Sequence, residues 1–100
     1  MRIIWAPLAL ERTLAIAQGI AEDSPQAAAE WAEGLFAAVG TLDRFPERGR
    51  IVPEIGQSAI RELIHRGYRV IYRVDPRRIV ILTVRHGRRL LDRGEIRLSP

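Results

Sequence analysis

Several residue types that build common functional sites are absent from this 100-residue chain or scarce in it. The sequence contains no cysteine and two histidines. The absence of cysteine excludes disulfides, thiolate zinc sites and redox-active thiols. Two histidines are too few for a histidine-rich metal site. We therefore expect no metal and no other cofactor.

Long apolar runs are also lacking. The first ten residues are mostly apolar, but Glu11 and Arg12 end that run well short of a signal peptide or a membrane span. Apolar residues make up 47% of the chain, which is ordinary for a globular protein. We expect a single domain over residues 1–100, located in the cytoplasm and without a membrane partner.

Lysine is absent too, so all 16 basic residues are arginines. Residues 1–46 contain three arginines and six acidic residues, whereas residues 47–100 contain thirteen arginines and six acidic residues. The net charges of the two parts are therefore −3 and +7, which sum to the overall +4. Such a basic half indicates a polyanionic or acidic partner, although a GC-rich genome would by itself favour arginine over lysine.

The first half of the chain is predicted to form one strand and a helical hairpin. Residues 2–5 are apolar and β-prone. Pro7 suits the first turn of a helix that continues to about Glu22. The apolar stripe of this helix is predicted to contain Leu10, Leu14, Ala17 and Ala21, with Ile16 and Ile20 beside it. Ser24 and Pro25 restart a second helix as N-cap and first residue, and Pro46 ends it. Its predicted apolar face is Trp31, Leu35, Ala38, Leu42 and Phe45.

The second half is predicted to be a connecting loop over residues 47–58 and then three strands. The strand-like runs cover residues 59–65, 68–74 and 79–85, separated by turns. Along the middle run, tyrosines and valines alternate with Arg69, Ile71 and Arg73, so we expect the tyrosine–valine face to pack on the helices. The predicted fold is α+β with the order β-α-α-β-β-β. In it, the helical hairpin packs on one face of a small, mainly antiparallel sheet, and a polar tail begins at His86.

Arginines on the other sheet face are the candidates for chemistry. Arg69 and Arg73 are expected there, with Arg61 available from the neighbouring strand. Guanidinium groups on rigid strands suit phosphate, because each presents a planar fork of donors. In RNA cleavage by internal 2′-hydroxyl attack, such groups could stabilise the pentacoordinate phosphorane. Alternatively, these arginines form a solvated strand face paired with Glu62.

Proton transfer in such a reaction needs a carboxylate or an imidazole. The candidates are Glu54 in the loop and His86 at the end of the last strand. Both could equally have structural roles, Glu54 as an ordinary loop carboxylate and His86 as a hydrogen-bonded side chain.

Several short motifs, taken in order, resemble the RelE/ParE superfamily of toxins from type II toxin–antitoxin systems. The resemblance covers nearly the whole chain, and its specificity lies in the joint order and spacing. The motifs are Ile-Ile-Trp at 3–5, Ile-Ala-Glu-Asp-Ser-Pro at 20–25, Phe-Pro-Glu-Arg-Gly-Arg at 45–50, Arg-Glu-Leu at 61–63, Gly-Tyr-Arg-Val-Ile-Tyr-Arg-Val at 67–74 and Val-Arg-His-Gly-Arg-Arg at 84–89.

This resemblance implies a growth-inhibiting toxin, of the kind associated with plasmid stabilisation, that is neutralised by a cognate antitoxin. In the family, an extended or helical antitoxin segment wraps around the toxin, and operator DNA is bound only through the toxin–antitoxin complex. RelE-like members are ribosome-dependent mRNA endonucleases, also called mRNA interferases. ParE-like members inhibit DNA gyrase.

The C-terminal motif favours the ParE-like branch. Arg69 matches an arginine used by some RNA-cleaving members, and Glu54 falls where certain members keep a general base. However, His86 is one residue out of register with their catalytic histidine, and the chain has no terminal tyrosine. We therefore expect a gyrase inhibitor that acts by binding, not by catalysis. Its expected binding residues are Arg69, Arg73, Arg85, Arg88 and Arg89.

Two alternatives remain at this point. One is a RelE-like endonuclease in which Arg61, Arg69 and Arg73 bind the scissile phosphate while Glu54 or His86 moves protons. That alternative predicts that Arg69→Ala abolishes toxicity and leaves the fold intact. The other is a degenerate, non-toxic module that only binds an antitoxin.

Overall fold

The structure is a computed structural model and describes residues 1–87. Strand β1 (Arg2–Trp5) leads into helix α1 (Pro7–Asp23), helix α2 (Pro25–Gly40) and the 3₁₀ turn η1 (Thr41–Asp43). Four strands follow, β2 (Arg50–Ile51), β3 (Ile60–His65), β4 (Tyr68–Val74) and β5 (Arg78–His86). The predicted α+β class and element order are confirmed, with the short β2 inside the predicted loop as an addition.

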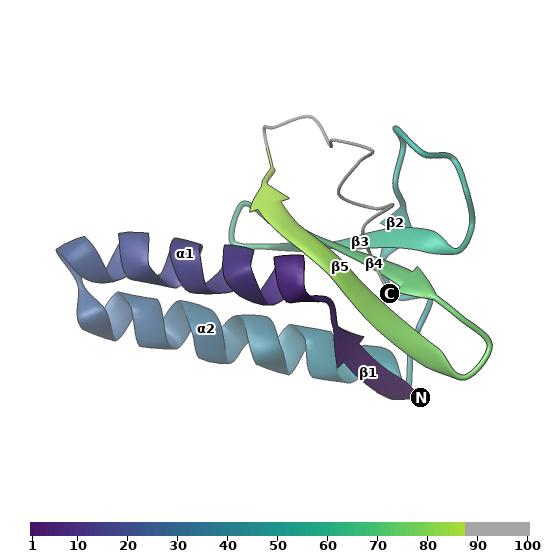
Figure 1. Cartoon of the computed structure of the whole chain (residues 1–100), viewed down its shortest axis with the longest axis horizontal. Coiled ribbons are helices and arrows are strands. Elements are labelled where there is room, and N and C mark those ends of the chain that lie inside the picture. The colour runs from purple at the N-terminus through teal and green to yellow at the C-terminus, as the bar shows by residue number, and fades with distance from the viewer. Residues whose placement is uncertain (88–100) are drawn as a thin grey trace.

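The strands of this part of the chain form one sheet in the order β1-β5-β4-β3-β2. β1 runs parallel to β5, and the other neighbours are antiparallel. The two helices lie side by side as an antiparallel hairpin over one face of the sheet (Figure 1). Within residues 1–87, no helix is long and apolar enough to cross a membrane.

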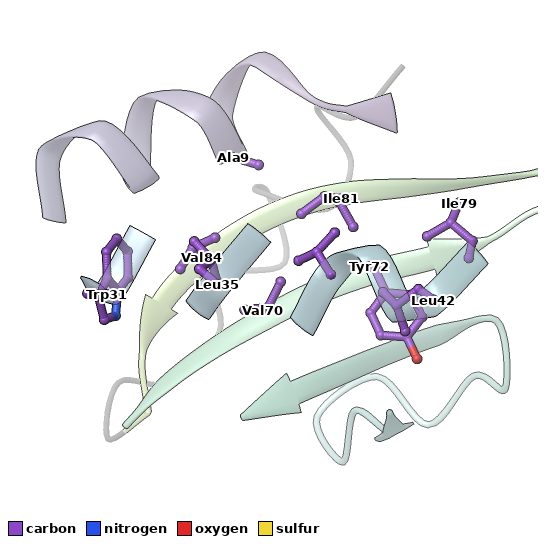
Figure 2. Packing of buried hydrophobic residues seen from close by; sticks show 10 residues of the cluster. Ala9, Trp31, Leu35, Leu42, Val70, Tyr72, Ile79, Ile81 and Val84 are labelled. Atoms are coloured by element: carbon purple, nitrogen blue, oxygen red, sulfur yellow. The ribbon is translucent and has the colours of Figure 1, made fainter. Parts of the chain in front are cut away.

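The core between the hairpin and the sheet contains Trp31, Leu35 and Leu42 of the face predicted for α2, and the alternating face of β4. Val39 is buried there in place of the predicted Ala38. Trp31, Leu35 and Leu42 pack against Val70 and Tyr72 (Figure 2), as predicted. The Ser24 hydroxyl caps α2 by accepting a hydrogen bond from the Ala27 N–H at 3.1 Å, again as predicted.

Two features of the helices differ from the prediction. In α1 the buried positions are Ala9 and Thr13, whereas Leu10 and Leu14 are 49% and 60% exposed. Ala9, Thr13, Ile16 and Ile20 are also spaced by three or four residues, so they form a second possible apolar face. This face lies about 100° around the helix from the predicted one. The small side chain of Ala9 decides between them, because it lets the helix approach the sheet closely.

α2 ends at Gly40 and not at Pro46, which leaves Phe45 exposed.

A second, smaller core covers the opposite sheet face. The side chains of Ile71, Val80 and Leu82 pack there against Val52 and Ile60. The regular alternation of side chains is interrupted along β5 because the pairing passes from Thr83–Ile71 directly to Ile81–Tyr72. Leu82 is therefore the extra residue of a β-bulge and faces the same side as its neighbour Thr83.

The loop before β2 is fixed to the sheet by Tyr72. The Tyr72 hydroxyl accepts a hydrogen bond from the Gly49 N–H at 2.8 Å and donates one to the Pro46 carbonyl at 2.8 Å. Burial raises the pKa of this phenol, while the Gly49 N–H acts in the opposite direction. A Cβ at residue 49 would lie 2.5 Å from the Glu62 carbonyl oxygen and 2.6 Å from the Tyr72 hydroxyl.

Replacing Gly49 by alanine should therefore destabilise the protein by about 1–3 kcal/mol, because both obstacles are buried and cannot easily move. The matched control is Gly19→Ala in the interior of α1, where a Cβ meets nothing within 4 Å. That substitution should stabilise the protein by about 0.5–1 kcal/mol through helix propensity. Urea unfolding followed by circular dichroism measures both changes, and equal effects would contradict the close approach at Gly49.

Candidate functional site

Arg69 lies at the centre of a group of alternating charges, here called the Arg69 cluster: Arg50, Glu54, Glu62 and Arg69. The Arg69 Nε donates a hydrogen bond to Glu62 Oε1 at 2.5 Å. Its two terminal nitrogens donate to the two carboxylate oxygens of Glu54, at 2.7 and 2.9 Å. The second oxygen of Glu62 accepts a hydrogen bond from the Arg50 Nε at 2.5 Å. Both carboxylates are therefore bound by guanidinium groups.

The sheet register explains how these residues meet. Glu62 in β3 is opposite Ile71, and Arg69 in β4 is opposite Ile64, so the two charged residues are diagonal neighbours on one face. This is the face away from the helical hairpin, as predicted for Arg69. Glu54 belongs to the loop that follows β2, and Arg50 begins β2. The cluster thus connects the edge strand and the loop to the face of the sheet.

The centre of the cluster is buried. The side chains of Glu62 and Arg69 are 0% and 7% exposed, while that of Glu54 is 26% exposed. The pKa of Arg69 is raised above its ordinary value, chiefly by the hydrogen bonds to Glu54, although burial acts in the opposite direction. The guanidinium therefore remains charged, and its position inside the fold is stabilised by carboxylates on two sides.

Arg61 does not join this cluster, which corrects the prediction that it shares a face with Arg69 and Arg73. Arg61 lies opposite Tyr72 and hence points to the hairpin side of the sheet. Its guanidinium donates hydrogen bonds to the carbonyls of Ser58 at 2.9 Å and Gly49 at 3.0 Å. Arg61 therefore holds the loops around β2 in place.

Arg73 lies on the same face as Arg69 but belongs to a separate group at the β4–β5 turn. It donates hydrogen bonds from two nitrogens to the carboxylate of Asp75, at 2.7 and 3.1 Å. Arg78 donates to the same carboxylate at 3.1 Å. Hydrogen bonding to Asp75 raises the pKa of Arg73, and the same interaction is the largest cause of the lowered pKa of Asp75.

His86 is also separated from Arg69. It lies opposite Tyr68, and the two rings meet edge to face with centroids 5.5 Å apart. Tyr68 in turn contacts Trp31 of α2 at 5.5 Å. Because Tyr68 and Arg69 are consecutive in β4, the His86 ring and the Arg69 guanidinium lie on opposite faces of the sheet.

Among the remaining predicted binding residues, Arg85 lies in β5 beside His86, and Arg88 and Arg89 lie outside the described residues. Sequence reasoning missed the part played by Arg50, because a short edge strand inside a loop leaves no periodic signal. The sequence predicts Glu62 only as a partner on a solvated face, whereas the structure buries it. Within residues 1–87, no group of three or more histidines and acidic residues could hold a metal ion.

The Arg69 cluster predicts a large effect for Arg69→Ala. This change leaves Glu62 buried with one partner, and we expect a loss of about 3–5 kcal/mol in unfolding free energy. The endonuclease alternative predicts that Arg69→Ala abolishes toxicity and leaves the fold intact. Because we expect this substitution to destabilise the fold, a loss of toxicity in Arg69→Ala would not identify a catalytic role. Arg73→Ala, four residues along the same strand, is the control and should cost about 1 kcal/mol or less because its ion pair is partly exposed. Urea denaturation measures both, and similar losses would contradict this account of burial.

The lowered pKa of Asp75 predicts that the stability of the protein depends on pH in the acid range. Its folded pKa is lower than its unfolded value, so its contribution to stability is complete above the ordinary aspartate pKa of 3.8 and is lost as the pH falls through the folded pKa. Asp75→Asn should therefore destabilise the protein at pH 6 and make less difference at pH 2.5. Urea midpoints of both proteins at these two pH values test this, and a constant difference would refute it.

Comparison with known proteins identifies the family. The model of the ParE toxin of type II toxin–antitoxin systems, parDE, matches residues 3–91. The fold is similar to that of a chain from the chromosomal ParDE toxin–antitoxin system of P. aeruginosa, with a TM-score of 0.71 at 20% identity, covering 86% of this chain and 95% of that chain. No curated protein matches the sequence. Because the family model spans most of the sequence, the chain belongs to the ParE toxin family of type II toxin–antitoxin systems.

Proposed function

We propose that this toxin inhibits growth by binding DNA gyrase, without catalysis, and that a cognate antitoxin neutralises it in the cytoplasm. Membership in the ParE family supports a toxin. The choice between gyrase binding and RNA cleavage depends on the residues that the second activity would use. The observation that carries the proposal is the Arg69 cluster.

RNA cleavage needs a guanidinium that can reach the scissile phosphate and a base that can accept the 2′-hydroxyl proton. Arg69 donates its Nε and both terminal nitrogens to glutamates and is 6% exposed. Glu54, the candidate base, has both oxygens on that guanidinium. His86, the other candidate, lies on the opposite sheet face. This arrangement favours a structural role for these residues and supports a binding mechanism.

The exposed arginines provide the binding surface in this proposal. Arg44, Arg48, Arg50, Arg66 and Arg77 are exposed in the described part of the chain. Together with Arg88 and Arg89 they give the toxin the basic character expected for an acidic partner surface. An acidic or amphipathic antitoxin segment would cover part of it, and operator DNA would be bound only by the resulting complex. The strength of this complex should fall as salt is added.

Two assays test the proposed activity together. In a supercoiling assay with purified gyrase, the wild-type chain should inhibit the enzyme. The double substitution Arg88→Gln with Arg89→Gln should require at least about a tenfold higher concentration, the effect of losing one or two charge-assisted contacts. Arg2→Gln removes an exposed charge outside this surface and should inhibit like the wild type.

The second assay maps mRNA 5′ ends after brief induction in cells. Arrested growth with intact mRNA is expected. New 5′ ends at codon boundaries, without inhibition of gyrase, would replace the proposal by the endonuclease alternative. Normal growth and an unaffected gyrase would show instead that the chain is a non-toxic antitoxin-binding module.

A further inference from the structure

Phe45 is a large aromatic residue that the fold places on the surface. It is 62% exposed, whereas Leu42, three residues earlier in η1, is fully buried. The sequence predicts one apolar face for both residues, and the end of α2 at Gly40 separates them. Among the described residues, Phe45 is the most exposed of the large apolar side chains.

The backbone at Phe45 is nevertheless held firmly. Its N–H donates a hydrogen bond to the Thr41 carbonyl at 3.1 Å, and its own carbonyl accepts one from the Arg48 N–H at 3.0 Å. The second bond closes a β-turn with Pro46 in its second position, a place that proline favours. Proline also restricts the backbone of the residue before it. We call residues 45–48 the Phe45 turn.

Two side chains attach the Phe45 turn to the rest of the protein. The hydroxyl of Tyr72, a fully buried residue, donates a hydrogen bond to the Pro46 carbonyl at 2.8 Å. The Arg48 Nη1 donates one to the Thr41 hydroxyl at 2.6 Å. The turn is therefore connected to the core and to η1 while the Phe45 ring extends into solvent. A partner that binds this turn finds it already in place, which lowers the entropy cost of association.

An open hollow of about 440 Å³ lies against the turn, and its lining consists of Phe45, Pro46, Glu47 and Arg48. The rings of Phe45 and Pro46 give it an apolar wall, and the other two residues give it charged sides. Such a hollow can receive an apolar side chain of another protein.

Arginines surround the Phe45 turn. Arg44, Arg48 and Arg50 are exposed, and Glu47 is the acidic residue among positions 44–50, so this segment has a net charge of +2. Protein interfaces commonly combine an apolar centre, enriched in aromatic residues and arginine, with a polar rim. The complementary surface is therefore an apolar side chain within an acidic rim.

This chemistry favours a protein partner over a single-stranded nucleic acid. Surfaces that bind unpaired bases stack them on successive aromatic side chains along a basic groove. The Phe45 turn offers one aromatic ring, followed by Pro46. The exposed carboxylate of Glu47 beside it would repel phosphates.

We propose that the Phe45 turn is the apolar anchor through which this toxin binds DNA gyrase. A gyrase side chain enters the hollow and packs against the Phe45 ring, and acidic gyrase residues lie opposite Arg44 and Arg48. This inference rests on the proposed function. It names the apolar contact of an interface for which only basic residues were considered above.

A supercoiling assay with purified gyrase and the full chain tests the anchor. Phe45→Ala should require at least about a tenfold higher concentration for inhibition, as expected for the loss of an interface hot spot. Leu14→Ala is the matched control, because Leu14 is 60% exposed on α1, and it should inhibit like the wild type. Phe45→Leu keeps an apolar side chain and should inhibit more strongly than Phe45→Ala. Circular dichroism checks that all three variants are folded.

Salt distinguishes an apolar anchor from an attraction between charges. Added salt screens ion pairs but does not weaken the burial of apolar surface. The factor by which Phe45→Ala raises the inhibitory concentration should therefore stay constant as salt is added, over the range in which gyrase is active. The corresponding factor for Arg88→Gln with Arg89→Gln should fall.

The outcomes separate this inference from the proposed function. Inhibition by the wild type that is unchanged in Phe45→Ala overturns the anchor and leaves the proposed function in place. Equal losses in Phe45→Ala and Leu14→Ala also overturn the anchor alone. A wild-type chain that does not inhibit gyrase overturns both. If Phe45→Ala leaves inhibition unchanged but loses self-association in sedimentation equilibrium, the turn binds a second copy of this chain instead.

A single-stranded oligonucleotide is the last probe. Fluorescence anisotropy that shows binding by the wild type and loss of binding in Phe45→Ala, with unchanged inhibition of gyrase, assigns the turn to nucleic acid and overturns the anchor. We expect Phe45→Ala and Leu14→Ala to bind the oligonucleotide like the wild type.

Discussion

A carboxylate inside a protein requires positive charge close to it, because transfer out of water is costly for an ion that finds no partner. In this toxin the carboxylate is that of Glu62, and each of its oxygens is bound by a different arginine. One of these arginines, Arg69, must be buried as well, and it needs a second carboxylate for its remaining nitrogens. Glu54 supplies it from a loop. The position of Glu62 therefore determines where the loop after β2 lies.

This chain of dependence divides the arginines into two groups with different roles. Arg61 and Arg69 stabilise the fold. Arg61 binds backbone carbonyls, and Arg69 neutralises two glutamates. Other arginines, such as Arg66 and Arg77, are exposed on the surface, where a partner can reach them. The strong positive charge of residues 47–100 thus overstates the charge of the surface, because part of it is balanced inside the molecule.

Much of the architecture was predictable from the sequence, because local signals decide it. Ser24 and Pro25 start α2, Arg66 and Gly67 adopt the positive φ angles of 48° and 85° that a two-residue hairpin requires, and β4 alternates regularly. The face of α1 was mispredicted because Leu10 and Ala9 fit the helical period equally well, and only the space beneath the helix distinguishes them. The predicted site was correct for the face of Arg69. It was wrong for Arg61. The sheet face on which its side chain lies depends on the pairing register of β3 with β4, and the sequence does not specify that register.

The parallel pairing of β1 with β5 affects when the protein can fold during its synthesis. Arg2 is paired with Arg78, 76 residues later, so β1 can form its sheet hydrogen bonds only after β5 has been synthesised. At a translation rate of about 5–20 residues per second, this interval lasts about 4–15 s. Throughout that time the apolar residues of β1 have no sheet to join. The nascent toxin therefore completes its sheet only after β5 has been synthesised and has emerged from the ribosome.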